Sequence, residues 1–139
     1  MLKKPLLIIL AFTLITAAAV FAGNKALSLM SSAPENGAED VAVDSAIILG
    51  FSSNVVNMKI SENNRECFLL IDAEGTEIES EVYLPDDQME PENKRTITLT
   101  PTAPLFPGTE YAVVISADLI AKNGNALGSE IIIKFTTAE

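Results

Sequence analysis

The sequence predicts an all-β fold of two packed antiparallel sheets, and three observations predict it. Short apolar runs recur about every ten residues, with clusters of Gly, Pro, Asn or Asp between them, a spacing typical of sandwiches. No long run with the apolar spacing of an amphipathic helix competes with these strands. Segment 99–111 has the pattern of a strand end, a proline-rich turn and a second strand that opens with a tyrosine.

Segment 99–111 defines the kind of sandwich. Proline fixes φ and lacks a ladder donor, so Pro107 and its neighbours belong at a sheet edge or corner. Gly108 is suited to a turn position with positive φ. Tyr111 follows where the tyrosine corner of a sandwich places its phenol against upstream backbone. We therefore expect an immunoglobulin-like β-sandwich of about seven strands.

In the first half of the chain, the sequence signals for the expected strands differ in strength. We expect a strand near 29–31, a turn over 33–37, and a strand over 46–51 with Phe51 on its inward face. Segment 55–60 fits either a short strand or a helical turn, and 62–65 is expected to be a polar loop. Segment 67–71 is apolar on both faces, which leaves its inward phase open. The other expected features are a hairpin turn over 72–75, a strand over 78–84 and a surface loop over 85–93.

The second half repeats the β pattern. The strand over 96–100 alternates Ile and Leu against threonines, as a half-buried strand does. The next strand directs Tyr111 inward, and the closing strand over 130–137 directs Phe135 inward. Between them we expect a brief helical turn over 117–121 and a tight turn over 123–125.

The N-terminus has the pattern of an export signal. Lys3 and Lys4 precede an apolar run, and Val20-Phe21-Ala22 provides small residues at the positions that a signal peptidase requires. We expect a signal peptide over 1–22, a linker over 23–29 and one domain over 30–139. The alternative is an uncleaved membrane anchor, because the apolar run approaches the lower length limit for a span. In both cases the rest is secreted, periplasmic or at the cell surface.

The charge of the exported part limits its partners. The whole chain has 9 basic and 19 acidic residues and a net charge of −10. Without Lys3 and Lys4 the balance is 7 − 19 = −12. Such a surface repels nucleic acid and anionic lipid, so neither is an expected partner. The sequence leaves the oligomeric state open.

Residue types also limit the chemistry. The chain has no His, which excludes His-based triads and His-ligated zinc. Cys67 is the single cysteine, so it cannot form a disulfide within the chain, and we interpret it as a packed strand residue. Four acids could be nominated as glycosidase pairs, but they share one hydrophilic loop and are interpreted as solvated: Asp86, Asp87, Glu90 and Glu92. No enzymatic activity is expected.

Metal binding is the alternative function. A calcium site could use acids near one end of the sandwich, although they lack the spacing of an EF-hand loop: Glu35, Glu39, Asp40 and Asp44. Thioether ligands for copper would come from Met30, Met58 and Met89, which are scattered and are interpreted as core filler. We expect no cofactor, with calcium as the weak exception.

An ordered set of short motifs resembles a known family. The set consists of Ala33-Pro-Glu-Asn-Gly-Ala-Glu-Asp-Val41, Ile47-x-Leu49-x-Phe51-Ser52, Asp72-x-x-Gly75, Leu99-Thr-Pro101, Leu105-x-Pro107-Gly-Thr109-x-Tyr111, Gly124-Asn-Ala-Leu127 and Phe135-Thr-Thr137. In this order they resemble the bacterial Ig-like domain of the S-layer (SbsA-like) type, over roughly residues 30–137. One departure is Ala121, which stands where the family commonly has Asp before the Gly-Asn turn, with Asp118 three residues earlier.

The resemblance implies a function by contact. Members of the family are usually non-catalytic modules of secreted or surface proteins, used as spacers, adhesion units or parts of an envelope layer. It therefore implies a structural component of the cell envelope or an adhesion unit whose partner is an envelope protein or glycan. The alternative is an extracytoplasmic calcium or copper protein, because the periplasmic copper carriers have a similar small sandwich. Those carriers depend on His ligands, which this chain lacks.

Overall fold

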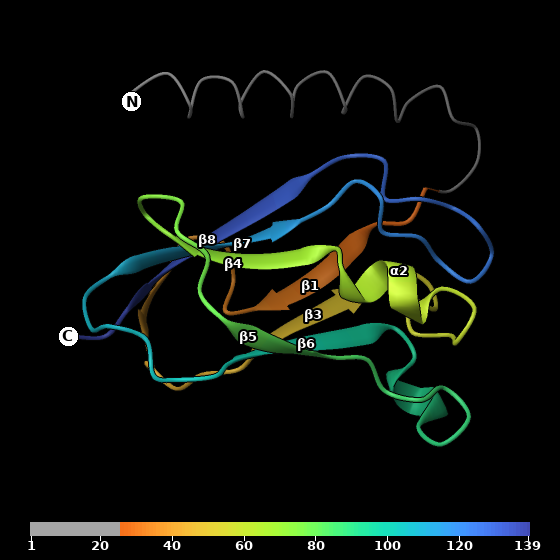
Figure 1. Cartoon of the computed structure of the whole chain (residues 1–139), viewed down its shortest axis with the longest axis horizontal. Helices are drawn as coiled ribbons and strands as arrows, with labels where there is room; N and C mark the ends of the chain where they lie inside the picture. The colour runs from red at the N-terminus through yellow and green to blue at the C-terminus, as the bar shows by residue number, and fades with distance from the viewer. Residues whose placement is uncertain (1–25) are drawn as a thin grey trace.

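The computed structural model describes residues 26–139, so the predicted signal peptide and its cleavage point before Gly23 lie outside the described residues. Two four-stranded sheets pack face to face (Figure 1). The first sheet has the order β1-β3-β6-β5 and the second the order β2-β8-β7-β4. The first sheet contains β1 (Leu29–Ala33), β3 (Ile47–Phe51), β6 (Thr96–Pro101) and β5 (Ser80–Tyr83). The second contains β2 (Ala38–Val41), β8 (Ile131–Thr137), β7 (Glu110–Ile115) and β4 (Phe68–Asp72).

The all-β, immunoglobulin-like fold predicted from the sequence is confirmed, with one strand more than expected. The additional strand is β2, which pairs in parallel with β8 through Ala38 opposite Phe135 and Val41 opposite Thr137. All other pairings between strands are antiparallel. Local sequence did not indicate β2, because its partner lies far along the chain and its two central residues are acids.

The core lies between the sheets, where alternate residues of each strand meet. Leu49 of β3 and Leu99 of β6 are fully buried, as the alternating pattern requires. The structure also fixes the phase of the ambiguous segment 67–71, since Phe68 and Leu70 point inward and Leu69 is 37% exposed. Phe51 meets Phe68 edge to face, with ring centroids 6.3 Å apart, which joins the two sheets.

Two segments differ from the sequence expectation. The segment expected as a polar loop over 62–65 lies in a short helix, α2 (Ser61–Arg65), and segment 55–60 forms the turn that leads into it. Part of the expected linker over 23–29 packs against the strands. Leu27 is only 3% exposed and its N–H donates to the carbonyl of Ala126 at 3.2 Å. Residues 27–29 therefore belong to the sandwich.

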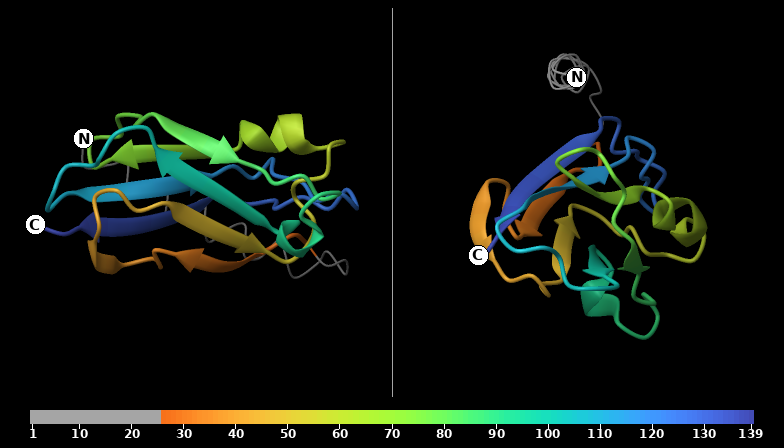
Figure 2. Two further views of the ribbon diagram at one scale, coloured as in Figure 1. Left: turned by 90° about the horizontal axis from the view of Figure 1, so that it is seen from below. Right: turned by 60° about the vertical axis from the view of Figure 1, so that its left-hand side comes forward.

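The connections gather at the two ends of the sandwich, which positions the candidate sites. Figures 1 and 2 place α2, the 3-10 turn η1 (Pro91–Asn93) and the β7–β8 connection at one end. The β6–β7 connection and the C-terminus lie at the opposite end. Within residues 26–139 no helix is both long and apolar enough to cross a membrane.

Candidate functional site

The corner predicted at Tyr111 is built from contacts on both sides of the β6–β7 connection. The Tyr111 hydroxyl accepts a hydrogen bond from the N–H of Phe106 at 2.9 Å, and its ring stacks on Phe135 with centroids 6.0 Å apart. The Thr137 hydroxyl donates to the carbonyl of Phe106 at 2.6 Å. Tyr111, Phe135 and Thr137 are each 2% exposed. Sequence reasoning did not single out Thr137, although a threonine at an expected inward position was the available signal.

Pro107 and Gly108 lie in the turn that follows Phe106 in the β6–β7 connection. Gly108 has φ of +59°, a left-handed conformation that favours glycine, and its N–H donates to the carbonyl of Ala138 at 3.0 Å. The Phe106 ring, by contrast, is 76% exposed. The corner thus fixes the backbone of the β6–β7 connection, and it presents no reactive group.

The proposed metal ligands do not converge. Among residues 26–139 no three His, Cys, Asp or Glu side chains group closely enough to hold a metal ion, and this includes Glu35, Glu39, Asp40 and Asp44. The interpretation of the methionines as core filler is wrong, because Met30, Met58 and Met89 are 69%, 85% and 78% exposed. These residues lie in β1, in the turn before α2 and in the β5–β6 connection, where the strand pattern does not bury them.

Cys67 is buried immediately before β4, with 6% of its surface exposed. Burial raises the pKa of the thiol, and the negative charge of Asp118 raises it further. The thiol also lies 3.4 Å from the carbonyl oxygen of Asn63, to which it donates. The environment disfavours the thiolate, which is the form needed for nucleophilic or metal chemistry.

The acids of the β5–β6 connection serve as anchors for their loop. The Asp87 carboxylate accepts hydrogen bonds from the side-chain amides of Asn54 and Asn57, each at 2.9 Å. The Asn57 bond and then the Asn54 bond lower the pKa of Asp87. Glu90 accepts from the Tyr83 hydroxyl at 2.6 Å, which lowers the pKa of Glu90 and raises that of Tyr83. Asp87 and Glu90 are therefore occupied in positioning the loop.

A buried asparagine that sequence reasoning missed connects this end of the sandwich. Asn64 of α2 is fully buried, and its amide donates to the carbonyls of Val55 at 2.8 Å and Ile120 at 2.7 Å. Its side-chain oxygen accepts from the N–H of Ile120 at 3.1 Å and from Asn63 at 2.9 Å. The polar sequence around Asn64 gave no sign of burial, because the side chain is satisfied only by distant backbone.

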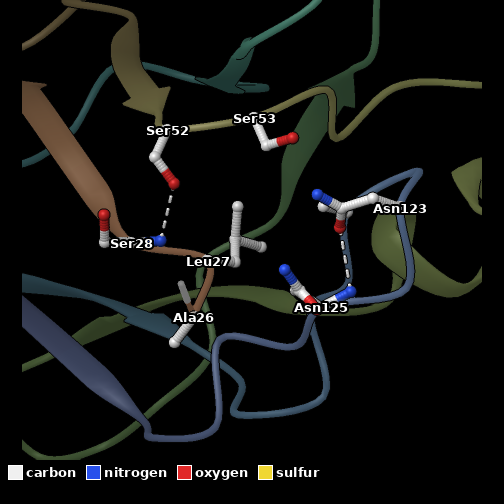
Figure 3. Close-up of a pocket in the computed structure, with 8 residues that line it drawn as sticks. Ala26, Leu27, Ser28, Ser52, Ser53, Asn123 and Asn125 are labelled. Carbon is white, nitrogen blue, oxygen red and sulfur yellow. Dashed lines mark hydrogen bonds between the residues drawn. The ribbon is translucent and has the colours of Figure 1, made fainter. Parts of the chain in front are cut away.

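The pocket nearest to these loops is open and neutral. It has a volume of about 330 Å³ and opens beside the start of β1, the end of β3 and the turn at 123–125 (Figure 3). Its lining is Ala26, Leu27, Ser28, Ser52, Ser53, Ala121, Asn123 and Asn125. Ser28 N–H donates to the Ser52 hydroxyl at 3.0 Å. No residue of this lining titrates near neutral pH, so the pocket can offer hydrogen bonds to neutral polar groups and no acid–base chemistry.

Comparison with solved structures shows the same fold in several bacterial proteins. CopC from Methylosinus trichosporium OB3b is 19% identical with a TM-score of 0.60, and the match covers 81% of this chain and 93% of that one. The N-terminal part of the bacterial S-layer protein SbsC is 16% identical with a TM-score of 0.56, over 88% of this chain and 26% of that one. Native alpha-2-macroglobulin from Escherichia coli, domains MG0-NIE-MG1, is 18% identical with a TM-score of 0.56, over 90% of this chain and 35% of that one.

These likenesses establish the fold, and the chain spans about a quarter of the SbsC fragment and about a third of the macroglobulin fragment. A search of curated proteins finds no match. The family described as bacterial Ig-like domain matches residues 23–137. Because this match covers most of the sequence, the chain belongs to the bacterial Ig-like domain family.

Proposed function

We propose that this chain is an exported, non-catalytic module of the cell envelope that works by contact with an envelope protein or glycan. The observation that carries the proposal is the bacterial Ig-like match over residues 23–137, directly after a segment with the pattern of a signal peptide. The proposal includes cleavage before Gly23 and a mature chain in the periplasm or at the surface. It involves no cofactor and no metal.

The chemistry of the described surface supports contact. The pocket beside β1 presents serine hydroxyls and asparagine amides, groups that bind neutral polar partners such as glycan hydroxyls or peptide backbone. The SbsC fragments share the fold, and this supports an S-layer-like structural role as one form of the proposal. The acidic net charge favours neutral or basic partners over anionic ones.

The test is capture from the native envelope. A tag at the C-terminus lies at the end of the sandwich opposite the pocket, so the pocket remains accessible (Figure 1). Ser53→Arg fills the pocket mouth and is expected to reduce capture, and Ser80→Arg in β5 is the matched control with a half-buried serine outside that lining. Loss of capture after protease or after glycan oxidation of the envelope identifies the partner class. If the native chain captures no envelope component beyond those that the heat-unfolded chain also captures, the proposal is overturned.

Calcium titration separates this proposal from the metal-binding alternative. A ligand that binds the folded state at about 100 times its Kd adds about 2.7 kcal/mol to stability. We expect no such rise in the thermal melting of the folded chain. A saturable rise that is lost on substitution of Glu39 and Asp40 would support the alternative.

A further inference from the structure

The β6–β7 connection exposes a group of apolar side chains at one end of the sandwich. Four of its residues are both apolar and exposed: Ala103, Pro104, Phe106 and Pro107. We call these four residues the corner tip. Leu105, which lies among them in the sequence, is buried instead, with 5% of its surface exposed. The corner tip lies at the same end as the C-terminus, opposite the pocket beside β1 (Figures 1 and 2).

Phe106 presents its ring from a backbone that is fixed on both sides. Its N–H donates to the Tyr111 hydroxyl at 2.9 Å, and its carbonyl accepts from the Thr137 hydroxyl at 2.6 Å. Both partner side chains are buried. The N–H of Leu105 donates to the carbonyl of Val43 at 2.9 Å, which holds the preceding residue as well. A group held in this way has little backbone freedom to lose on binding, which favours affinity.

The Phe106 ring takes no part in the contacts that build the corner. All of the hydrogen bonds at this residue use its backbone. The ring is absent from the core cluster between the sheets and from the residues packed against that cluster. One exposed apolar side chain is ordinary on a protein surface, but here a rigidly held aromatic ring has exposed prolines on both sides in the sequence. Aromatic rings are enriched at interfaces because each buries a large area.

The charged side chains around the corner tip are all acidic. Hydrogen bonds from Leu105 to Val43 and from Gly108 to Ala138 bring three segments together here. These segments contain three acids and no Lys or Arg, and the acids are Asp44, Glu110 and Glu139. All three acids are exposed. The corner tip is therefore an apolar surface with a negative border.

We infer that the corner tip binds a partner protein that offers an apolar pocket bordered by Lys or Arg side chains. The Phe106 ring fills the pocket, and the acids face the cationic border, whose side chains can also lie over the ring. A second copy of this acidic chain and an anionic membrane both fit poorly, because each would place negative charge against the acids. The inference rests on the proposed contact function and adds a second contact surface to it.

Capture followed by titration tests the inference. The mature chain is tagged at its N-terminus, because Ala26, the first described residue, lines the pocket at the other end of the sandwich. Proteins captured from the detergent-solubilised envelope are purified and titrated against the unmodified chain and Phe106→Ala. We expect one whose dissociation constant rises at least about thirtyfold in Phe106→Ala, as for the loss of an interface hot spot. Met58→Ala is the matched control, because it removes an apolar side chain that is 85% exposed, in the turn before α2.

A pair of double variants tests the negative border. Glu110→Gln with Glu139→Gln should weaken binding several-fold at low salt and should make the affinity less dependent on salt concentration. Glu62→Gln with Glu92→Gln removes the same charge from α2 and η1 at the other end, and should leave the affinity unchanged. Equal affinities of the two double variants would contradict a cationic border on the partner.

Thermal melting separates binding from folding. Because the hydrogen bonds at Phe106 use its backbone, Phe106→Ala should melt at the temperature of the unmodified chain. A clear fall would show that the ring supports the fold, and the inference would be wrong. It is also wrong if Phe106→Ala captures everything that the unmodified chain captures, or if Met58→Ala loses the same proteins. A captured component that resists protease is a glycan or a lipid and overturns the partner class.

The two contact surfaces are tested by different variants. Ser53→Arg changes the pocket beside β1, and Phe106→Ala changes the corner tip at the other end. Capture that depends on Ser53 and is unaffected by Phe106→Ala would overturn this inference and still support the proposed function.

Discussion

Tyr111 combines two kinds of contact in one side chain. Its ring fills space between the sheets against Phe135, and its hydroxyl fixes the backbone of the β6–β7 connection at Phe106. Removal of the hydroxyl and removal of the ring therefore have different consequences. The first leaves one backbone donor without its partner, and the second also opens a cavity in the core.

Tyr111→Phe should lower the free energy of unfolding by about 0.5–1.5 kcal/mol, and Tyr111→Ala by ~3–5 kcal/mol. Denaturant melts of both variants provide the measurement. Met58→Ala is the control, because Met58 is 85% exposed, and a surface change of this kind stays within about 0.5 kcal/mol. If Tyr111→Ala costs under about 1 kcal/mol, Tyr111 is not a core residue by that standard.

Cys67 should react with a thiol reagent slowly until the domain unfolds. The reason is that burial both blocks access and raises the pKa of the thiol. A raised pKa means that the folded state favours the protonated thiol, so its stabilising contribution is present below the ordinary thiol pKa and is lost as pH rises through the folded value. Labelling rates followed by mass spectrometry, in buffer and in denaturant, test this. Equal rates in the two conditions would contradict the assignment of Cys67 to the interior.

At the scale of elements, α2 depends on a single polar side chain. The helix has five residues, too few to be stable by itself, and Asn64 ties it to the segments at Val55 and Ile120. These hydrogen bonds replace the apolar contacts by which a longer helix would dock.

Asn64→Leu keeps the side-chain size but leaves the backbone groups of Val55 and Ile120 without their hydrogen-bond partner. Each buried group without a partner costs about 1–3 kcal/mol of stability. We expect a total loss of more than ~2 kcal/mol of unfolding free energy in denaturant melts. Glu62→Leu changes an exposed residue of the same helix and should cost clearly less. Equal effects of the two substitutions would show that α2 does not depend on Asn64.

The β5–β6 connection is held through Asp87, and this contact depends on pH. The pKa of Asp87 is lowered in the folded state, so its contribution is present above the ordinary carboxyl pKa and is lost as pH falls through the folded value. Asp87→Asn should therefore speed proteolysis within residues 84–95, and acidification should have the same effect on the unmodified chain. Glu92→Gln is the control on the same loop. An unchanged cleavage rate in Asp87→Asn would mean that the loop is held by other contacts.

At the scale of the whole molecule, the proposed export predicts where the mature chain begins. Intact-mass measurement on protein from the native compartment should show a chain that begins at Gly23 or within a few residues of it. Retention of Met1 or Leu2 would instead support the uncleaved anchor, and the domain would then be tethered to a membrane. The same preparation is the material for the capture experiment.

The fold could be predicted because its strands are encoded locally. Alternation of Ile47, Leu49 and Phe51 sets the inward face of β3, and the proline-rich turn before Tyr111 marks the corner. Such signals depend on residues within a few positions of one another. The acids around Glu39, by contrast, suggested a metal site only because sequence proximity was taken as proximity in space, and the described residues do not bring three ligands together.

The sequence by itself determined the all-β class, the corner at Tyr111, the acidic charge and the absence of His chemistry. The tertiary structure alone decided the burial of Asn64, the exposure of Met30, Met58 and Met89, and the gathering of Leu69, Val114 and Ile132 on one outer face. The physical reason is that backbone conformation follows from neighbouring residues. The hydrogen-bond partner of a buried polar side chain depends instead on segments far apart in the chain. The same is true of the apolar side chains that lie beside one another on a surface.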